Sequence, residues 1–107
     1  MAIIYATPLG GTTASTPTYV LLSGDIDILT TERLRRQLLH ALNHSTSSLV
    51  LDLSQVTFCG ADGLRVLLKV QVRAKESGTA LTLTGLSPIL ARLLRVTGLD
   101  QRFTIAA

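Results

Sequence analysis

Residues 49–69 read LVLDLSQVTFCGADGLRVLLK, which places an apolar run, a turn and an amphipathic segment in immediate succession. The run Leu49–Leu53 is compact and apolar, as is typical of a central strand that is covered on both faces. Residues 57–63, which include Gly60 and Gly63, predict a turn. The apolar residues then follow a helical period to about Ser77, and we expect Gly78 to end this helix. A strand that leads into a helix in this way is typical of an α/β fold with parallel strands.

Further strands flank this unit. Four other segments carry the apolar or alternating pattern of strands, namely 3–9, 19–22, 81–84 and a short terminal strand at 103–105. The residues from Gly10 to Pro17 favour turns, and we expect a loose loop there between the first two strands. The resulting order, β-β-α-β-α-β-α with a last β, requires parallel pairing with right-handed crossovers. We therefore expect a small mixed sheet with helices packed on it.

Each expected helix has one apolar face. Thr30 is expected to cap the first helix, with Glu32 in its first turn. Val66 and Val70 widen the apolar arc of the second helix, and they either form a surface for a partner or pack against a neighbouring helix. The residues expected to face inward are Leu34, Leu38, Ala41 and Leu42 in the first helix, Leu64, Leu67, Gln71 and Ala74 in the second, and Ile89, Leu90, Leu93 and Val96 in the third.

The composition of the chain excludes several classes of protein. At 107 residues, with 47% hydrophobic and 16% charged residues, we expect one folded domain that spans residues 1–107. The net charge of +3 is spread over the polar faces of three segments, with 4% aromatic residues, which argues against nucleic-acid binding. A single cysteine, Cys59, excludes an internal disulfide and a cysteine-based zinc site. Since no apolar run is long enough for a bilayer and no signal peptide is recognisable, we expect a cytoplasmic domain without membrane contact.

The sequence patterns of the common catalytic and cofactor sites are absent. There is no Gly-x-x-x-x-Gly-Lys, Gly-x-Gly-x-x-Gly or Gly-x-Ser-x-Gly motif. His40 and His44 have the spacing of a metal pair, but no third ligand is evident, so we expect both to face solvent. Asp25 and Asp27 are not a catalytic pair, because neither a basic residue nor a metal motif accompanies them. Asp52 is not the phosphoacceptor of a receiver domain, because the chain has no lysine late in its sequence. We therefore predict that the chain is not an enzyme and has no catalytic residue, cofactor or metal.

Asp62 is the most informative single residue. It lies between an expected buried strand and a helix N-terminus, at the carboxyl end of a parallel sheet, where α/β proteins bind ligands. The free N–H groups and the helix dipole favour a negative charge there. Asp62 either caps the helix or takes part in binding and regulation, and its spacing does not separate these alternatives. Nucleotide binding at the turn Gly60–Gly63 is a further alternative that the sequence leaves open.

Several stretches together resemble one family. They are LSGDID at 22–27 followed by 30–34, then 49–53 with 56–58, then 63–68, and GLSP at 85–88 leading to 97–100. In this order and spacing they resemble the STAS-domain anti-sigma factor antagonists (anti-anti-sigma factors) of bacteria, over nearly the whole chain. The resemblance implies the STAS fold, a small mixed sheet of four to five strands with three to four helices packed on it.

The function implied by the resemblance is switchable protein binding in the control of transcription. Members of this family bind an anti-sigma factor that is also a serine-protein kinase, and they thereby free the sigma factor. The kinase phosphorylates a serine at the start of the second helix, which abolishes binding, and a phosphatase reverses the reaction. A phosphate has this effect because it adds about −1.5 to −2 charges and bulk to the contact surface. The oligomeric state is not indicated.

The turn before the second helix departs from the family pattern. The family commonly has Asp-Ser-Ser-Gly or Asp-Thr-Ser-Gly where this chain has Gly60-Ala61-Asp62-Gly63. Asp62 therefore stands in place of the phosphorylatable serine, and Ala61 removes the neighbouring hydroxyl. Asp62 either mimics phosphoserine permanently or leaves the protein able to bind, since the turn still carries one carboxylate in total. We slightly favour the second hypothesis.

The family's contact surface can be transferred to this chain position by position. The transferred partner-binding residues are Gly24, Asp25, Asp27, Thr30, Gly60, Ala61, Asp62, Gly63, Arg65 and Val66.

Two alternatives remain for phosphorylation and for function. Ser54 and Thr57, which precede the turn, are less favoured alternative phosphorylation sites. The alternative function is that of a non-phosphorylatable STAS scaffold or interaction module in a signalling complex.

Overall fold

The computed structural model of the chain describes residues 3–8, 18–27, 30–43 and 48–106. The loop expected at Gly10–Pro17 and the expected solvent exposure of His44 both lie outside the described residues.

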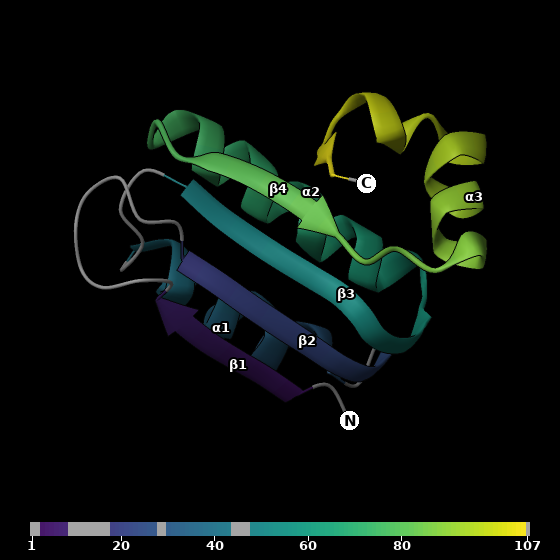
Figure 1. The fold of residues 1–107 in the computed structure, drawn as a ribbon, viewed down its shortest axis with the longest axis horizontal. Helices are drawn as coiled ribbons and strands as arrows, with labels where there is room; N and C mark the ends of the chain where they lie inside the picture. The colour runs from purple at the N-terminus through teal and green to yellow at the C-terminus, as the bar shows by residue number, and fades with distance from the viewer. Residues whose placement is uncertain (1–2, 9–17, 28–29, 44–47, 107) are drawn as a thin grey trace.

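The described strands form one five-stranded sheet (Figure 1) in the order β1-β2-β3-β4-β5. Strand β1 is antiparallel to β2, whereas the pairs β2–β3, β3–β4 and β4–β5 are parallel. This topology confirms the expected α/β class and the mixed sheet, including the short terminal strand. The strands are β1 (Ile3–Pro8), β2 (Thr18–Ile26), β3 (Ser48–Cys59), β4 (Ala80–Thr84) and β5 (Thr104–Ile105).

Two of the helices cover one face of the sheet. Figure 1 shows α1 and α2 behind the strands, whereas α3 lies beyond the carboxyl end of β4. In the part of the chain that the structure describes, no helix has both the length and the apolar character needed to cross a membrane. The helices are α1 (Thr31–Asn43), α2 (Ala61–Glu76) and α3 (Pro88–Thr97), followed by a short 3₁₀ helix at Leu99–Gln101.

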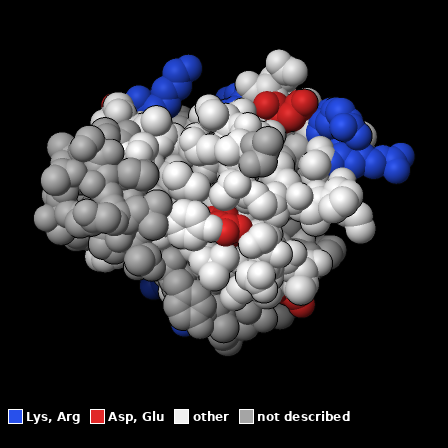
Figure 2. Space-filling model, viewed as in Figure 1, with Lys and Arg blue, Asp and Glu red and all other residues white. Residues whose placement is uncertain are grey.

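The helices α1 and α2 cover the central strand β3 on one face, so the prediction that this strand is covered on both faces is wrong. Leu49 and Leu51 are fully buried, whereas Val50 and Asp52 on the other face are half-buried. The Tyr19 hydroxyl donates a hydrogen bond to Asp52 Oδ2, and the Ser54 N–H donates to Oδ1 at 2.8 Å. These bonds satisfy the Asp52 carboxylate on the open face. Figure 2 shows that lysine and arginine side chains lie around the rim of this face and not at its centre.

Strand β3 also runs further than its apolar pattern indicated. The turn predicted at residues 57–63 is wrong, because the strand continues to Cys59 and α2 begins at Ala61. Val56 and Thr57 are β-branched, which suits an extended backbone. The β2–β3 ladder reaches the pair Ile26–Cys59 through two register shifts, and at each of them β3 advances by one residue more than β2.

The inward face of α3 differs from the prediction. Leu90 and Leu94 are buried, whereas Ile89 is 82% exposed and Val96 is 73% exposed, so the prediction that these two face inward is wrong. The physical reason is that apolar residues lie on more than one side of this helix, so periodicity alone does not single out the buried side, which holds Leu90 and Leu94. The helix is capped by Ser87, whose hydroxyl accepts a hydrogen bond from the Leu90 N–H at 3.1 Å.

Gly63 allows the first turn of α2 to lie directly against the ends of β2 and β3. A Cβ atom at this position would lie 2.5 Å from Ile26 Cγ2 and 2.9 Å from Cys59 Sγ. Both distances are too short for a non-bonded contact, so any larger residue must displace the core. Gly60, the N-cap of α2, is held at the same place because its N–H donates to the Ile26 carbonyl at 3.0 Å.

Replacement of Gly63 by alanine should therefore destabilise the protein. We expect Gly63→Ala to lower the free energy of unfolding by about 1–3 kcal/mol, as overpacking does. In an ordinary helix position the same change raises stability by about 0.5–1 kcal/mol, so the sign of the effect tests the contact. Urea unfolding followed by circular dichroism measures it. Lys75→Ala on the exposed side of α2 is the control and should change stability by less than about 0.5 kcal/mol.

Candidate functional site

The candidate site lies at the carboxyl edge of the sheet, where β2 and β3 end and α1 and α2 begin. Because β2 and β3 are parallel, their carboxyl ends lie at the same edge. The hydrogen bond from the Gly60 N–H to the Ile26 carbonyl joins the two segments there. The structure thus brings the expected residues of the first segment, 24–30, close to those of the second, 60–66, as far as both are described.

The first segment is tied to β3 through Asp25. The Thr57 hydroxyl of β3 donates a hydrogen bond to Asp25 Oδ1. The Thr30 hydroxyl accepts a hydrogen bond from the Asp27 N–H at 3.1 Å, and this bond links the end of the first segment to the start of α1. The Thr30 carbonyl accepts the Leu34 N–H at 3.0 Å, so Thr30 occupies the expected N-cap position of α1. These bonds hold the Asp25 carboxylate at the surface, where the side chain is exposed.

Asp62 lies in the first turn of α2 and is open to solvent. Its side chain is 42% exposed, and its Oδ1 lies 3.5 Å from Nη1 of Arg65, whose side chain is 76% exposed. The N-cap of α2 is Gly60, and no side chain caps this helix end. The interpretation of Asp62 as the capping residue is therefore wrong, although its charge is still favoured by the helix dipole.

A shallow polar groove of about 200 Å³ runs between the starts of α1 and α2. Arg35 forms an ion pair and hydrogen bonds with Glu32 across one turn of α1. The hydrogen bond from Arg35 lowers the pKa of the Glu32 carboxyl, so that side chain is ionised at neutral pH. The groove therefore presents charges of both signs to an incoming molecule. It is lined by Thr31, Glu32, Arg35, Asp62, Arg65, Val66 and Lys69.

Two of the expected contact residues are buried. Gly63 packs against β2 and β3, and Val66 is 7% exposed. Val70 is fully buried. The wide apolar arc of α2 is therefore explained by packing in the core and not by a surface for a partner. Of the other expected residues, Asp25, Ala61 and Arg65 are exposed, and Gly24, Asp27, Thr30, Gly60 and Asp62 are partly exposed.

Five residues of this edge are not among the expected contact residues. Thr57 is expected solely as an alternative phosphorylation site, whereas its hydroxyl holds Asp25. Thr31, Glu32, Arg35 and Lys69 line the groove beside Asp62. The sequence carries a signal for the last three, since they are charged residues on the polar faces of the two helices that begin at this edge.

The chemistry of the edge is that of a binding surface. Across the described ranges, no three His, Cys, Asp or Glu side chains lie close enough together to hold a metal ion. His40 is exposed, as expected. The groups that the edge offers are carboxylates, guanidinium and ammonium groups and small exposed residues, which suit contacts with another molecule.

Comparison with known proteins finds a family model that matches most of the chain. Residues 12–106 match the family model described as the Mlab, STAS domain. The structure is similar to that of an anti-sigma factor antagonist from Mycobacterium paratuberculosis, with a TM-score of 0.79, 28% identity, and coverage of 98% of this chain and 85% of the other.

Two more distant structures share the fold. One is the Bacillus cell fate determinant SpoIIAA in its phosphorylated form, with a TM-score of 0.70, 14% identity, and coverage of 98% and 92% of the two chains. The other is RsbS of Moorella thermoacetica with a serine-to-glutamate substitution, with a TM-score of 0.69, 23% identity, and coverage of 96% and 85%.

Cys59, at the end of β3, should react slowly with thiol reagents. Burial raises the pKa of its thiol from 9.0 to about 11. Since the thiolate is the reactive form and its fraction is about 100-fold lower, while the more basic thiolate is about tenfold more nucleophilic, we expect disulfide exchange at pH 7.5 to be about tenfold slower than for an unhindered cysteine. The rate should rise about tenfold per pH unit up to about pH 11, as the thiolate fraction rises. Spectrophotometric titration with a disulfide reagent measures this, with glutathione as the reference thiol. A rate that levels off below pH 9 would contradict the burial of the thiol.

Proposed function

Because the chain belongs to the STAS domain family, we propose that it acts as an anti-sigma factor antagonist, which binds an anti-sigma factor and so releases a sigma factor for transcription. The observation that carries this proposal is the exposed, mixed-charge carboxyl edge, in a chain that matches the mycobacterial antagonist over nearly its whole length. The protein acts by binding and not by turnover. We place this activity in the bacterial cytoplasm.

The proposed partner is an anti-sigma factor that is also a serine-protein kinase. It contacts the carboxyl edge at Asp25, Asp27, Ala61, Asp62 and Arg65. Gly60 and Ala61 have little or no side chain, so a partner can approach the backbone of the turn closely. The charged residues beside them give the contact its orientation.

Asp62 takes the place of the phosphorylated serine in this proposal. Its single charge faces the Arg65 guanidinium at 3.5 Å, which partly balances it. A phosphate carries about −1.5 to −2 charges and three acceptor oxygens, so a carboxylate is a weak substitute for it. We infer that Asp62 leaves the protein able to bind its partner and removes the switch.

The alternative phosphorylation sites are less suited to a switch. Thr57 is exposed, but its hydroxyl is engaged with the Asp25 carboxylate. A phosphate there would lie against that carboxylate and be repelled by it. Ser54 is exposed on the open side of the sheet, next to the bonded Asp52 carboxylate.

A scaffold role is the second candidate function. The observation that favours it is the lack of a hydroxyl group at Gly60–Gly63, since a structural module needs no phosphorylation. In that role the same edge would bind a constant component of a signalling complex. A gene for an anti-sigma factor kinase or a sigma factor beside the gene for this chain would favour the first function.

The partner and the role of Asp62 are tested together by calorimetric titration with an anti-sigma factor kinase of the same organism. Native protein, Asp62→Ser and Asp62→Ala should bind in the presence of ADP with affinities within about fivefold, because an exposed ion pair contributes at most about 1 kcal/mol. With ATP, Asp62→Ser should become phosphorylated and lose at least about tenfold in affinity, whereas the other two should be unchanged.

Two outcomes contradict this proposal in different ways. If Asp62→Ser binds more than about tenfold tighter than native protein with ADP, Asp62 acts as a permanent phosphoserine mimic. If neither native protein nor Asp62→Ser binds the kinase at all, the antagonist function is wrong and the scaffold role is favoured.

A further inference from the structure

Helix α3 exposes an apolar stripe. Ile89 and Val96 are 82% and 73% exposed, and Leu93 between them is half-buried. At 100° per residue these three lie within about 60° of one another around the helix, so they form one continuous strip. Two exposed β-branched residues on a short helix are more than packing against the sheet requires, because Leu90 and Leu94 already supply that contact.

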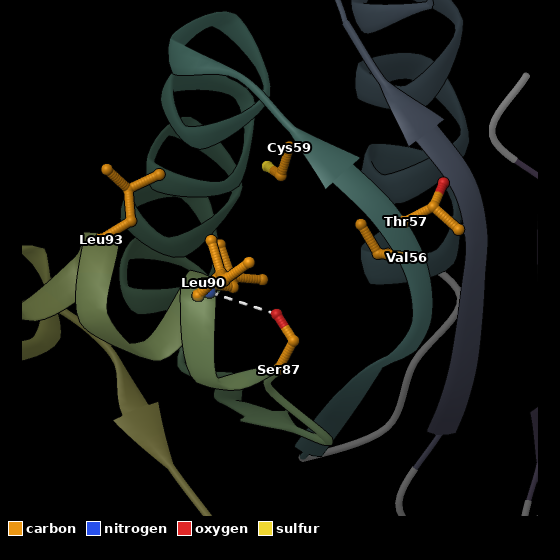
Figure 3. Close-up of a pocket in the computed structure, with 7 residues that line it drawn as sticks. Val56, Thr57, Cys59, Ser87, Leu90 and Leu93 are labelled. Atoms are coloured by element: carbon orange, nitrogen blue, oxygen red, sulfur yellow. Dashed lines mark hydrogen bonds between the residues drawn. The ribbon is translucent and has the colours of Figure 1, made fainter.

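A groove continues the stripe toward the end of β3. Figure 3 shows Leu90 and Leu93 of α3 on one side of it and Val56 and Cys59 of β3 on the other. Its volume is about 360 Å³, which is enough for several apolar side chains. Its remaining lining residues are Thr57, Ser87 and Ile89.

Basic residues border the stripe on its outer side. Arg92 lies one helical turn from both Ile89 and Val96, and Arg95 follows it around the helix. Both are exposed, and neither has an ion-pair partner within the described ranges. The ten residues of α3 include no acidic side chain. The surface is therefore an apolar groove next to a row of unpaired positive charges.

We propose that this surface, formed by the stripe Ile89, Leu93 and Val96 and the adjoining groove, binds an acidic amphipathic helix of a partner protein. The apolar residues of that helix enter the groove at i, i+3/i+4 and i+7 spacing, and its carboxylates pair with Arg92 and Arg95. This proposal goes beyond the role of the Asp62 edge and does not depend on it.

The charges and the shape favour this occupant over two others. In a symmetric pair of copies, the arginines of one α3 would face those of the other, with no acidic residue on either helix to compensate. A membrane surface is flat and would leave the concave groove unfilled, and α3 offers it a strip of three side chains.

The proposal is tested by nuclear magnetic resonance titration of the ¹⁵N-labelled full chain with three synthetic helical peptides. The first carries leucines at i, i+4 and i+7 with glutamates elsewhere. The second has lysines in place of the glutamates, and the third has alanines in place of the leucines. We expect the first to shift the amide signals of residues 89–96 and 56–59 and to bind at least about tenfold more tightly than either control peptide.

Matched variants separate the two parts of the contact. Ile89→Ser should weaken binding of the acidic peptide at least about fivefold while leaving the melting temperature unchanged, since the side chain is exposed. The double variant Arg92→Glu and Arg95→Glu should bind the lysine peptide more tightly than the acidic peptide. Asp62→Ala should leave peptide binding unchanged, so failure here is distinct from failure of the antagonist function.

Three results would overturn the proposal. The first is the absence of shifts in α3 with any peptide, or equal binding of the acidic and basic peptides. The second is concentration-dependent dimerisation that Ile89→Ser abolishes, which assigns the stripe to a second copy. The third is binding to vesicles of phosphatidylcholine and phosphatidylglycerol through α3 without peptide binding, which assigns it to a membrane.

Discussion

The absence of a side chain at Gly63 is the constraint on which the rest of this structure depends. Without a Cβ atom there, the first turn of α2 lies against Ile26 and Cys59, and the Gly60 N–H reaches the Ile26 carbonyl. The ends of β2 and β3 and the start of α2 are thereby held as one unit. The candidate binding surface is therefore positioned by the sheet and not by a loop, and a surface positioned in this way is already organised before a partner arrives.

The last residues of β3 serve two surfaces at once. Thr57 holds the Asp25 carboxylate on the polar edge, and it also lines the apolar groove beside α3. The first surface carries charges of both signs, and the second combines an apolar hollow with Arg92 and Arg95. The two surfaces thus differ in chemistry while sharing one rigid strand, which suits contacts with two different molecules.

Periodicity predicted the order of the strands and helices, because each has a regular apolar pattern that a parallel α/β sheet can bury. It did not predict the inward face of α3, since apolar residues such as Ile89 and Leu94 lie on more than one side of this helix. The apolar run in β3 did not reveal that one face of the strand is open. The position of Asp62 at a helix start was predictable, but its pairing with Arg65 and the burial of Gly63 depend on contacts that no local pattern encodes.

The exposure of Asp62 has a consequence for how such proteins diversify. Positions 61 and 62 both face solvent, so their side chains can be exchanged without repacking the interior. The buried glycine beside them has no such freedom. Two surface replacements can therefore change the charge and the chemistry of this turn, while the packing beneath it stays intact.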